Sequence, residues 1–588
     1  MRHMTLSEQS LSDKTGTHAV RAARAFGEKK MKTSAATAKS RNVSRMARLT
    51  LSGASLLLLL LAFGVSRAAT LLVTTTADPG SGTCNTSSGC ALRDAISNAA
   101  PNDTIEFAIP STDPGCVSPG VCTIVLDQSA GQLLITNNVT IDGVGQNITL
   151  DGSSRQRLLL NAGAVVNINS LTFANAYCEG DVCPGALGGA AIINFGTLTV
   201  TNSSFSGNSV GYSDPFVSPA GIYGRDAYGG SAIYSEGVGA VVSIANSTFT
   251  GNSGPGTGGA IFDAGDSLSI TDSTFSGNSG GSGGAVGSFG TAASIKNSTF
   301  SGNSGEDGGA VAVFSGTLTV TNSTFSGNSS VVAGAVHNLY GATTITNSTL
   351  AGNVAPQGGE VANETGTLIL NNTIVANSSG SGNCAAAGTL TRGGPITDGG
   401  GNLSDDSSCG FQTTSLSGAN PNLGPLQNNG GPTQTLALLA GSPAIALGVP
   451  ANCPATDQRG APRPGLGQNC SSGAFQYVAP AQLKVAPSNV SFGRVPLFRL
   501  RTTTVTVTNT GTVPVSISNV SVTSGTRASS REFLALSLCP PSLAVHSICK
   551  IAVAFFAQDL GPQSATLKIA SNAAGNPLSI PLSATVVP

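Results

Sequence analysis

The sequence contains no Trp and few charged residues. Asp, Glu, Lys and Arg together make up 10% of its 588 residues, whereas 40% are hydrophobic. Extensive disorder is excluded, because a disordered chain combines high charge with few apolar groups. Gly is abundant instead, with 76 residues, and Ser, Thr and Asn recur throughout. This composition favours an all-β protein rich in turns.

Basic residues are scarce beyond the N-terminal segment. Residues 1–69 hold twelve Lys or Arg and three Asp or Glu, and the whole chain has a formal net charge of −1, so the remainder carries −10. The phosphate backbone of a nucleic acid requires a basic protein face. The sequence therefore predicts no nucleic-acid partner for the mature protein.

Metal-ligand spacing is also missing. The sequence has no Cys-x-x-Cys, and of its four His residues only His546 lies near a cysteine, three residues before Cys549. Structural zinc sites need several Cys and His at close, regular spacing. We therefore predict no metal ion and no cofactor.

The twelve cysteines form neighbouring pairs along the chain. An even number of cysteines in an exported protein predicts disulfide bonds, although sequence alone leaves their connectivity open. Proximity favours the pairs Cys84–Cys90, Cys116–Cys122, Cys178–Cys183, Cys384–Cys409, Cys453–Cys470 and Cys539–Cys549.

The basic N-terminal segment leads into an apolar run at residues 49–65. Small residues follow, with Ser66 and Ala68 at the −3 and −1 positions of a signal-peptidase site. Residues 1–68 are thus predicted to be a basic n-region and signal peptide, and the mature protein to be extracellular or at the cell surface without a membrane span. An uncleaved signal anchor is the alternative. The apolar run is shorter than the ~20 residues that span a bilayer, which argues against an anchor.

The middle of the chain repeats one phrase, NSTFSGNS. Its six copies lie at 246–253, 272–279, 297–304, 322–329, 347–354 and 371–378. The apolar residue at the fourth position recurs every 24 to 26 residues. Self-similarity at such a period is the signature of a solenoid.

Residues 123–398 are predicted to form the solenoid, with irregular early coils up to Phe173 and three recurring features from there onward. These features are an Asn three residues after the Phe, a Gly-Gly-small-apolar step and a β run such as LTV at 198–200. Three short strands in about 25 residues predict a right-handed parallel β-helix of about ten coils. We expect Phe in the core, Asn in a left-handed corner and a hydrogen-bonded ladder, and Gly where a side chain would clash.

Residues 70–122 are predicted to cap the first coil. The segment 90–100 places Leu92, Ile96 and Ala99 on one helical face, which could cover the open end of the strands. CALRDAI followed by NDTIEFAIP resembles the CSLREA-type start of exported bacterial β-helix proteins. The repeats at 170–380 resemble those of the chlamydial polymorphic outer membrane proteins, which are surface adhesins.

Residues 399–477 lose the repeat and are predicted to form a C-terminal cap. The phrases NNGGPTQTLALLAGSPAIALG and CSSGAFQY resemble the choice-of-anchor Q region that closes many such β-helices. Ala446, Ser471 and Gln476 stand where that family carries acidic residues, which puts a cation-binding role in doubt.

A separate β-sandwich is expected at residues 483–588, after a linker at Pro480–Gln482. Period-2 runs separated by turns, together with VSFG, TVTNTGTVPV and IAVAFFAQDLG, resemble the ASPM–SPD-2–Hydin domain of the choice-of-anchor D type. The resemblance implies an immunoglobulin-like fold and no particular chemistry.

Two insertions interrupt the repeat in adjacent coils. The distance from Phe to the next Gly-Gly is eight or nine residues in ordinary coils, but 15 after Phe173 and 24 after Phe205. Both insertions occupy the same loop, so they should emerge side by side. Aromatic side chains with an Arg and an Asp suit a glycan or a surface protein, whereas the alternative is that they cover a gap in the solenoid. The candidate ligand-binding residues are Tyr177, Tyr212, Phe216, Tyr223, Arg225, Asp226 and Tyr228.

No catalytic residue is predicted. Polysaccharide lyases and hydrolases with this fold need a calcium-binding carboxylate cluster or paired acids. Asp263 and Asp266 should face solvent separately from Asp307, Asp272 replaces a turn Asn, and His337 lacks an evident partner. The sequence favours a non-enzymatic exported scaffold that binds a glycan or partner. An enzyme with an unrecognised site and a purely structural envelope protein remain alternatives, and the oligomeric state is not predicted.

Overall fold

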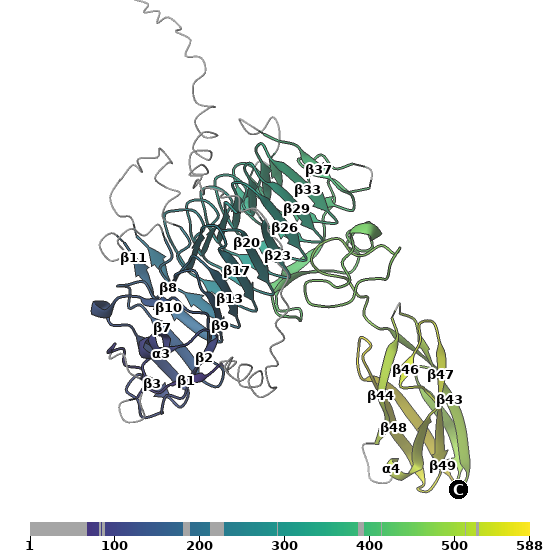
Figure 1. Ribbon diagram of the computed structural model, residues 1–588. Coiled ribbons are helices and arrows are strands. Elements are labelled where there is room, and N and C mark those ends of the chain that lie inside the picture. The colour runs from purple at the N-terminus through teal and green to yellow at the C-terminus, as the bar shows by residue number, and fades with distance from the viewer. Residues whose placement is uncertain are drawn as a thin grey trace, which may run out of the picture. The chain divides into compact units, whose positions relative to one another are not determined.

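The computed structural model describes residues 68–588 apart from 81–83, 85–88, 180–187, 212–228, 291, 381, 386–392, 413, 512 and 525–528. The predicted signal peptide, apart from Ala68, therefore lies outside the described residues. The fold is nearly all β (Figure 1).

Three sheets build the solenoid, and each inner coil contributes one parallel strand to each sheet. Sheet 1 holds twelve strands: β1 (Thr70–Val73), β2 (Asp103–Phe107), β6 (Val139–Asp142), β9 (Val165–Asn169), β13 (Thr197–Thr201), β17 (Val241–Ala245), β20 (Ser267–Thr271), β23 (Ala292–Lys296), β26 (Thr317–Thr321), β29 (Ala342–Thr346), β33 (Thr367–Asn371) and β37 (Ile396–Asp398). Figure 1 shows most of these strands stacked in order.

Sheets 2 and 3 complete the coil. Sheet 2 holds β3 (Cys116–Ser118), β4 (Val121–Val125), β7 (Asn147–Asp151), β10 (Leu171–Ala174), β14 (Ser204–Ser206), β18 (Thr248–Thr250), β21 (Thr274–Ser276), β24 (Thr299–Ser301), β27 (Thr324–Ser326), β30 (Thr349–Ala351), β34 (Ile374–Ala376) and β38 (Leu403–Ser404). Sheet 3 holds β5 (Leu133–Ile135), β8 (Leu159–Asn161), β12 (Ile192–Asn194), β16 (Ile233–Glu236), β19 (Ile261–Ala264), β22 (Val286–Ser288), β25 (Val311–Val313), β28 (Val336–Asn338), β32 (Val361–Asn363) and β36 (Cys384–Ala385). At the start of sheet 2, β3 pairs antiparallel with β4. The predicted parallel β-helix is confirmed.

The helix α3 (Leu92–Asn98) lies at the start of the solenoid, against β1 and β5. Leu92, Ile96 and Ala99 are buried, as the helical pattern predicts. Arg93 forms a bidentate ion pair with Asp78, at 2.7 and 2.8 Å, and donates to the carbonyl of Gly131 at the end of the 3-10 turn η1 (Gln128–Ala130). The helix therefore covers the first strands of two sheets.

The repeated Phe residues form one stack through the core. Phe173, Phe205, Phe249, Phe275, Phe300 and Phe325 are all fully buried. Successive ring centroids lie 4.6 to 4.8 Å apart with nearly parallel planes. This spacing is the distance between hydrogen-bonded strands, so in-register pairing imposes the stack.

Two different Asn residues of the repeat have the two roles that we assigned to one, the left-handed corner and the hydrogen-bonded ladder. The Asn before Ser-Thr or Ser-Ser adopts the left-handed conformation, as Asn246 does with φ 48°, and Asp272 replaces it with φ 49°. The ladder runs instead through the Asn three residues after the Phe. There Asn252 donates from Nδ2 to Asn278 Oδ1 at 2.9 Å and to the Phe205 carbonyl at 3.0 Å.

Gly residues occupy the corner before sheet 3 for both predicted reasons. Gly283 has φ +68°, and a Cβ on Gly284 would lie 2.2 Å from the Gly309 carbonyl oxygen. In the AGAV repeat, Ala333 keeps the left-handed conformation with φ 58°. In these regular coils the backbone of the next coil fills the side-chain space of the second glycine.

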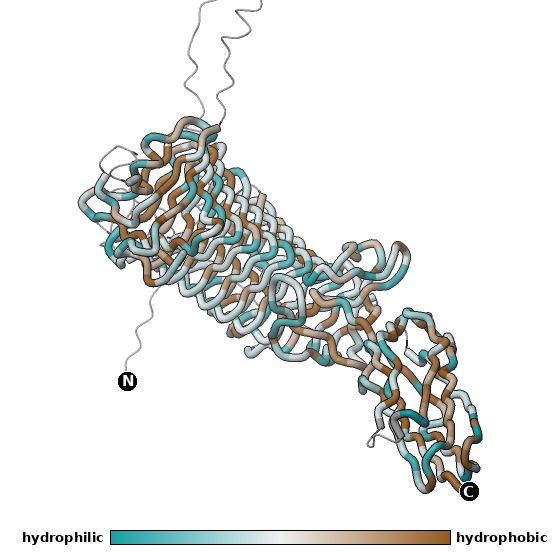
Figure 2. Tube along the Cα trace, turned by 90° about the horizontal axis from the view of Figure 1, so that it is seen from below, coloured by the Kyte–Doolittle hydropathy of each residue, from teal (hydrophilic) through white to brown (hydrophobic). Residues whose placement is uncertain are grey.

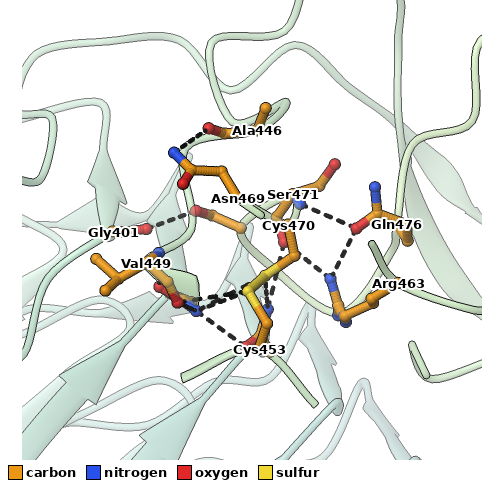
Figure 3. The surroundings of a disulfide bond; sticks show 12 residues. Gly401, Ala446, Val449, Cys453, Arg463, Asn469, Cys470, Ser471 and Gln476 are labelled. Carbon is orange, nitrogen blue, oxygen red and sulfur yellow. Dashed lines mark hydrogen bonds between the residues drawn. A yellow bond between two sulfur atoms is a disulfide. The ribbon is translucent and has the colours of Figure 1, made fainter. Parts of the chain in front are cut away.

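The solenoid extends to β38, beyond the predicted boundary at residue 398, and the chain from there to residue 477 folds back over the outer side of sheet 2. This segment contains β39 (Leu423–Gln427), β40 (Thr435–Leu438) and the 3-10 turn η3 (Pro450–Asn452). Gln458 donates to Thr299 Oγ1 at 2.9 Å and accepts from Thr324 Oγ1 at 2.6 Å, so one cap side chain joins two coils. The disulfide Cys453–Cys470 lies beside the same sheet (Figure 3).

Residues 481–588 form a two-sheet β-sandwich with its own core. One sheet has the order β41 (Leu483–Ala486), β43 (Leu500–Asn509), β47 (Ile548–Phe556) and β45 (Phe533–Ser537). The other has the order β42 (Val490–Pro496), β49 (Leu578–Val587), β48 (Gly561–Ser571), β44 (Val515–Ser524) and β46 (Ser542–Leu543), and α4 (Ser529–Glu532) precedes β45. Ala481, predicted to lie in a linker, is buried in this core and accepts a hydrogen bond from the Ala574 amide.

Five of the six expected disulfides are present: Cys84–Cys90, Cys116–Cys122, Cys384–Cys409, Cys453–Cys470 and Cys539–Cys549. Cys178 is also disulfide-bonded, but its expected partner Cys183 lies outside the described residues. The disulfides indicate an oxidising environment.

Candidate functional site

The two insertions start side by side, as predicted. The short strands β11 (Tyr177–Cys178) and β15 (Ser209–Val210) pair in parallel, with Tyr177 opposite Ser209 and Cys178 opposite Val210. A similar pair, β31 (Val354–Ala355) and β35 (Ser379–Gly380), forms at the other end of the solenoid. Both insertions therefore leave the solenoid at one edge and in one direction.

Of the candidate ligand-binding residues, only Tyr177 lies within the described part of the chain. It is partly exposed, and its hydroxyl donates to Glu179. The remaining candidates lie outside the described residues: Tyr212, Phe216, Tyr223, Arg225, Asp226 and Tyr228. Their grouping into one surface stays a prediction.

Arg157 holds both ends of the first insertion. Its guanidinium donates to the Gly188 and Gly189 carbonyls at 3.1 and 2.9 Å, and to Cys178 Sγ at 2.9 Å. The side chain is 7% exposed, and burial lowers its pKa to about 10. A buried cation costs free energy unless hydrogen bonds replace its water, and here carbonyl oxygens do so. Arg157 was not among the predicted site residues, although an Arg just before the apolar run LLLN is a visible signal.

A neutral groove lies where sheet 1 turns into sheet 2 in the early coils. It has a volume of about 640 Å³, within the usual range for ligand pockets. Amide and hydroxyl groups of Asn147, Asn202 and Thr172 line it beside Val121 and Val144, and no charged residue does. Such a lining suits an uncharged polar ligand.

The outer side of sheet 3 carries a row of aromatic rings. The centroids of Tyr234 and Phe262 lie 4.9 Å apart, and those of Phe289 and Phe314 lie 4.1 Å apart. Phe289 is 36% exposed. Because the rings stack on one another, they present edges rather than open faces to solvent. This row is therefore a poor platform for sugar rings, which stack on open aromatic faces.

Asp263 does not face solvent, which corrects our prediction. It is fully buried at the end of β19, and one carboxylate oxygen, Oδ2, has no hydrogen-bond partner among the described residues. Burial raises its pKa to about 6, while hydrogen bonds from the Gly265 amide and Ser235 oppose the shift. Asp266 in the same coil is exposed, so these two acids do not form an open catalytic pair.

His337 has two acidic neighbours, which also corrects the sequence analysis. Its Nδ1 lies 3.9 Å from Asp307 Oδ1, and its Nε2 lies 3.7 Å from Glu364 Oε1. The imidazole is 1% exposed, and burial lowers its pKa to about 4. It is therefore neutral at pH 7 and closed off from a dissolved substrate. The sequence missed these contacts because the three residues sit at different points of successive coils.

Ser471 and Gln476, two of the three residues that depart from the expected acidic pattern, lie beside Arg463, whereas the carbonyl of the third, Ala446, accepts from Asn469. Gln476 Oε1 accepts from the Ser471 amide at 2.9 Å and from Arg463 at 3.4 Å, and the Ser471 carbonyl accepts from Arg463 at 2.8 Å (Figure 3). Burial lowers the Arg463 pKa to about 10. The positive charge of Arg463 disfavours a metal cation at this place.

The described residues hold no group of three or more His, Cys, Asp or Glu side chains that could bind a metal ion. In the same part of the chain, no helix has the length and apolar character needed to cross a membrane.

Residues 231–393 match the family model of the right-handed β-helix region. No curated protein sequence matches the chain. The matched segment covers the most regular coils and establishes the fold there. The match describes the fold alone.

Solved structures with similar parts share little sequence. The secreted serine protease VesC from Vibrio cholerae is 20% identical over 16% of this chain and 21% of its own, with a TM-score of 0.15. PapD-like domain 7 of human CEP192 is 15% identical over 18% of this chain and 87% of its own, also at 0.15. The Dettilon tailspike protein is 10% identical over 83% of this chain and 94% of its own, with a TM-score of 0.21. The chain thus spans about a fifth of the VesC structure.

Proposed function

We propose that this protein is an exported β-helix scaffold that binds a glycan or a surface protein and is not an enzyme. The observation that carries the proposal is the pairing of β11 with β15, which starts two aromatic-rich insertions at one edge. Regular coils need only core, ladder and corner residues. Segments that leave them side by side are free to form a recognition surface.

Arg157 supports the same proposal. It ties the start of the first insertion, at Cys178, to its end, at Gly188 and Gly189. Holding both ends of a loop lowers the conformational entropy that the loop loses on binding, which favours affinity. The buried cation thus has a use at the binding surface beyond fold stability.

Glycan-array binding tests the proposal with the full chain and the variants Tyr223→Ala and Tyr228→Ala. We expect the wild type to bind and both variants to lose most of that signal, because an aromatic ring contributes much of the contact with a sugar. Tyr340→Ala is the matched control, since this Tyr is 54% exposed on another part of the solenoid. Binding that survives both substitutions would rule out the insertion surface.

The neutral groove provides a second test of location. Thr172→Arg would place a long cation in the groove lining. If this variant alone abolishes glycan binding, the site is the groove and the insertions serve another purpose.

An enzymatic function is the second candidate, and Asp307 and Glu364, the partly exposed acids on either side of the buried His337, are the groups that it would use. A polysaccharide lyase would release unsaturated products and a hydrolase would release new reducing ends. Activity on acidic polysaccharides that disappears in His337→Ala would establish it. With neither binding nor turnover, the structural envelope role would stand.

A further inference from the structure

The outer face of sheet 1 is an array of hydroxyl groups. Strands β13, β17, β20, β23, β26 and β29 each direct their first, third and fifth residues outward, because Leu, Val, Ile, Ala or Thr at the second and fourth positions are buried. Of these eighteen outward residues, thirteen are Thr or Ser, four are Ala or Val and one is Lys296. All eighteen are exposed or partly exposed.

The array is regular in two directions. Each of these strands pairs with the next over all five residues without a register shift. Neighbouring strands lie ~4.8 Å apart, and alternate residues along a strand lie about 6.7 Å apart. Thr199, Ser243, Ser269, Ser294, Thr319 and Thr344 therefore form one straight row. Figure 2 shows that pale stretches of intermediate hydropathy recur along the stacked coils of the solenoid.

The fold holds this array rigid. Each strand is fixed on both sides by its neighbours, and its inward residues belong to the continuous core. β-Branched Thr also has few rotamers, so its hydroxyl and methyl groups keep their positions. Hydroxyl groups held in this way offer fixed hydrogen-bonding positions at the spacing of the array.

We propose that the outer face of sheet 1 binds ice. Its two repeats are close to those of oxygen atoms on the prism face of ice. A lattice of water matches a plane of alternating hydroxyl and methyl groups and needs no groove or charged anchor. This function is separate from glycan binding at the insertions.

The charge and shape of the face disfavour other partners. A glycan chain is usually held by open aromatic faces or charged groups, and these eighteen outward positions include no aromatic and no acidic residue. A protein partner would be expected to satisfy hydroxyls one at a time with its own donors and acceptors. The cap does this on sheet 2, where Thr299, Thr324 and Thr349 each bond to a cap group.

The experiment measures how much of the full chain enters a slowly growing ice crystal. We expect incorporation of the wild type and its loss in Thr319→Lys and Thr344→Lys, because a long cation disrupts the plane. Both variants should fold, since β23 already carries Lys296 on this face, and circular dichroism verifies this. Thr504→Lys, on an exposed strand position of the sandwich, is the control and should enter ice like the wild type.

The reverse substitution, Lys296→Thr, removes the single charge. It should increase incorporation, a gain that misfolding cannot produce. Exclusion of the wild type from ice, or equal incorporation of the Lys variants, overturns the proposal. Binding to crystalline cellulose or chitin that the Lys variants lose, without any ice binding, would also overturn it and assign the face to a polysaccharide crystal.

Discussion

Buried charges mark the positions where single residues depart from the repeat. Arg157 ties the ends of an insertion, and Asp263 ends a strand of sheet 3. Glu360 stands where other coils have Ala after Gly-Gly, and there it accepts from the amide and side chain of Asn353, the last Asn of the ladder. Burial raises the pKa of Glu360 well above its ordinary value. In a chain with so few charges, each of these residues does something that the regular coil does not require.

Asp263 should make stability depend on pH. Its pKa is about 6 in the folded protein, against an ordinary value of 3.8. Between these values the folded state binds more protons than the unfolded state, so stability falls as pH rises, by up to about 3 kcal/mol. We expect Asp263→Asn to remove this slope and to be more stable than the wild type at pH 7, because Asn occupies the equivalent position in β12 and β28.

Urea denaturation at pH 4 and pH 7 measures the effect. Asp266→Asn is the control, since it changes an exposed acid in the same coil and should keep the slope. Equal pH dependence in wild type and Asp263→Asn would show that Asp263 is ionised in the folded state at no cost.

At the scale of elements, the two Asn residues of the repeat have different structural roles. Asn246 makes the corner between sheets 1 and 2, where its left-handed backbone is what matters. Asn252 is fully buried and links three coils through Asn208, Asn278 and the Phe205 carbonyl. One residue type at two positions of the repeat therefore offers an internal comparison.

The substitutions Asn252→Ala and Asn246→Ala should differ in cost. Loss of Asn252 leaves buried groups of Asn208 without an acceptor, so we expect unfolding free energy to fall by about 2–4 kcal/mol. Ala at position 246 adopts the left-handed conformation at a cost of about 1 kcal/mol. Asn246→Gly should be close to neutral, because glycine adopts this conformation freely.

Chemical denaturation of the three variants distinguishes the two roles. Equal losses in Asn252→Ala and Asn246→Ala would contradict the division between ladder and corner.

At the scale of the whole molecule, the cap joins residues far apart in sequence. Gln458 bonds to Thr299 and Thr324, more than 130 residues earlier. Arg463 donates to Asn322 at 3.1 Å and to the Gly473 carbonyl at 2.8 Å. A solenoid whose coils contact only their neighbours can unfold locally. Such cap contacts oppose this by joining several coils through one segment.

Gln458→Ala tests this coupling. The buried Thr324 hydroxyl would lose its acceptor and the cap would lose its bonds to β24, so we expect a loss of about 2–4 kcal/mol. The neighbouring Gln434 has an exposed side chain, so Gln434→Ala should cost little. Hydrogen exchange should also become faster in coils β24 to β30 of the Gln458 variant. Unchanged exchange there would show that the cap does not stabilise the coils.

The sequence by itself determined the β-helix, its period and its core. Identical residues about every 25 positions must stack when strands pair in register. Phe275 and its equivalents were therefore expected to form one stack in the core. The cysteine pairs were predictable for another reason, because the partners are neighbouring cysteines along the chain, 6 to 25 residues apart. The adjacent start of the two insertions followed from the repeat count alone.

Only the tertiary structure decided which side chains meet across coils. The contact of His337 with Asp307 and Glu364, the burial of Asp263 and the reach of Gln458 to Thr299 depend on exact register and on how loops cover sheet 3 and sheet 2. The Thr and Ser residues of the sheet 1 array are visible in the sequence as TLTVT and SLSIT. Only the structure shows that these residues face outward and that six strands carry them in register. The sequence repeat determines the strands and core residues of each coil. Contacts between residues at different positions of different coils depend on the tertiary structure.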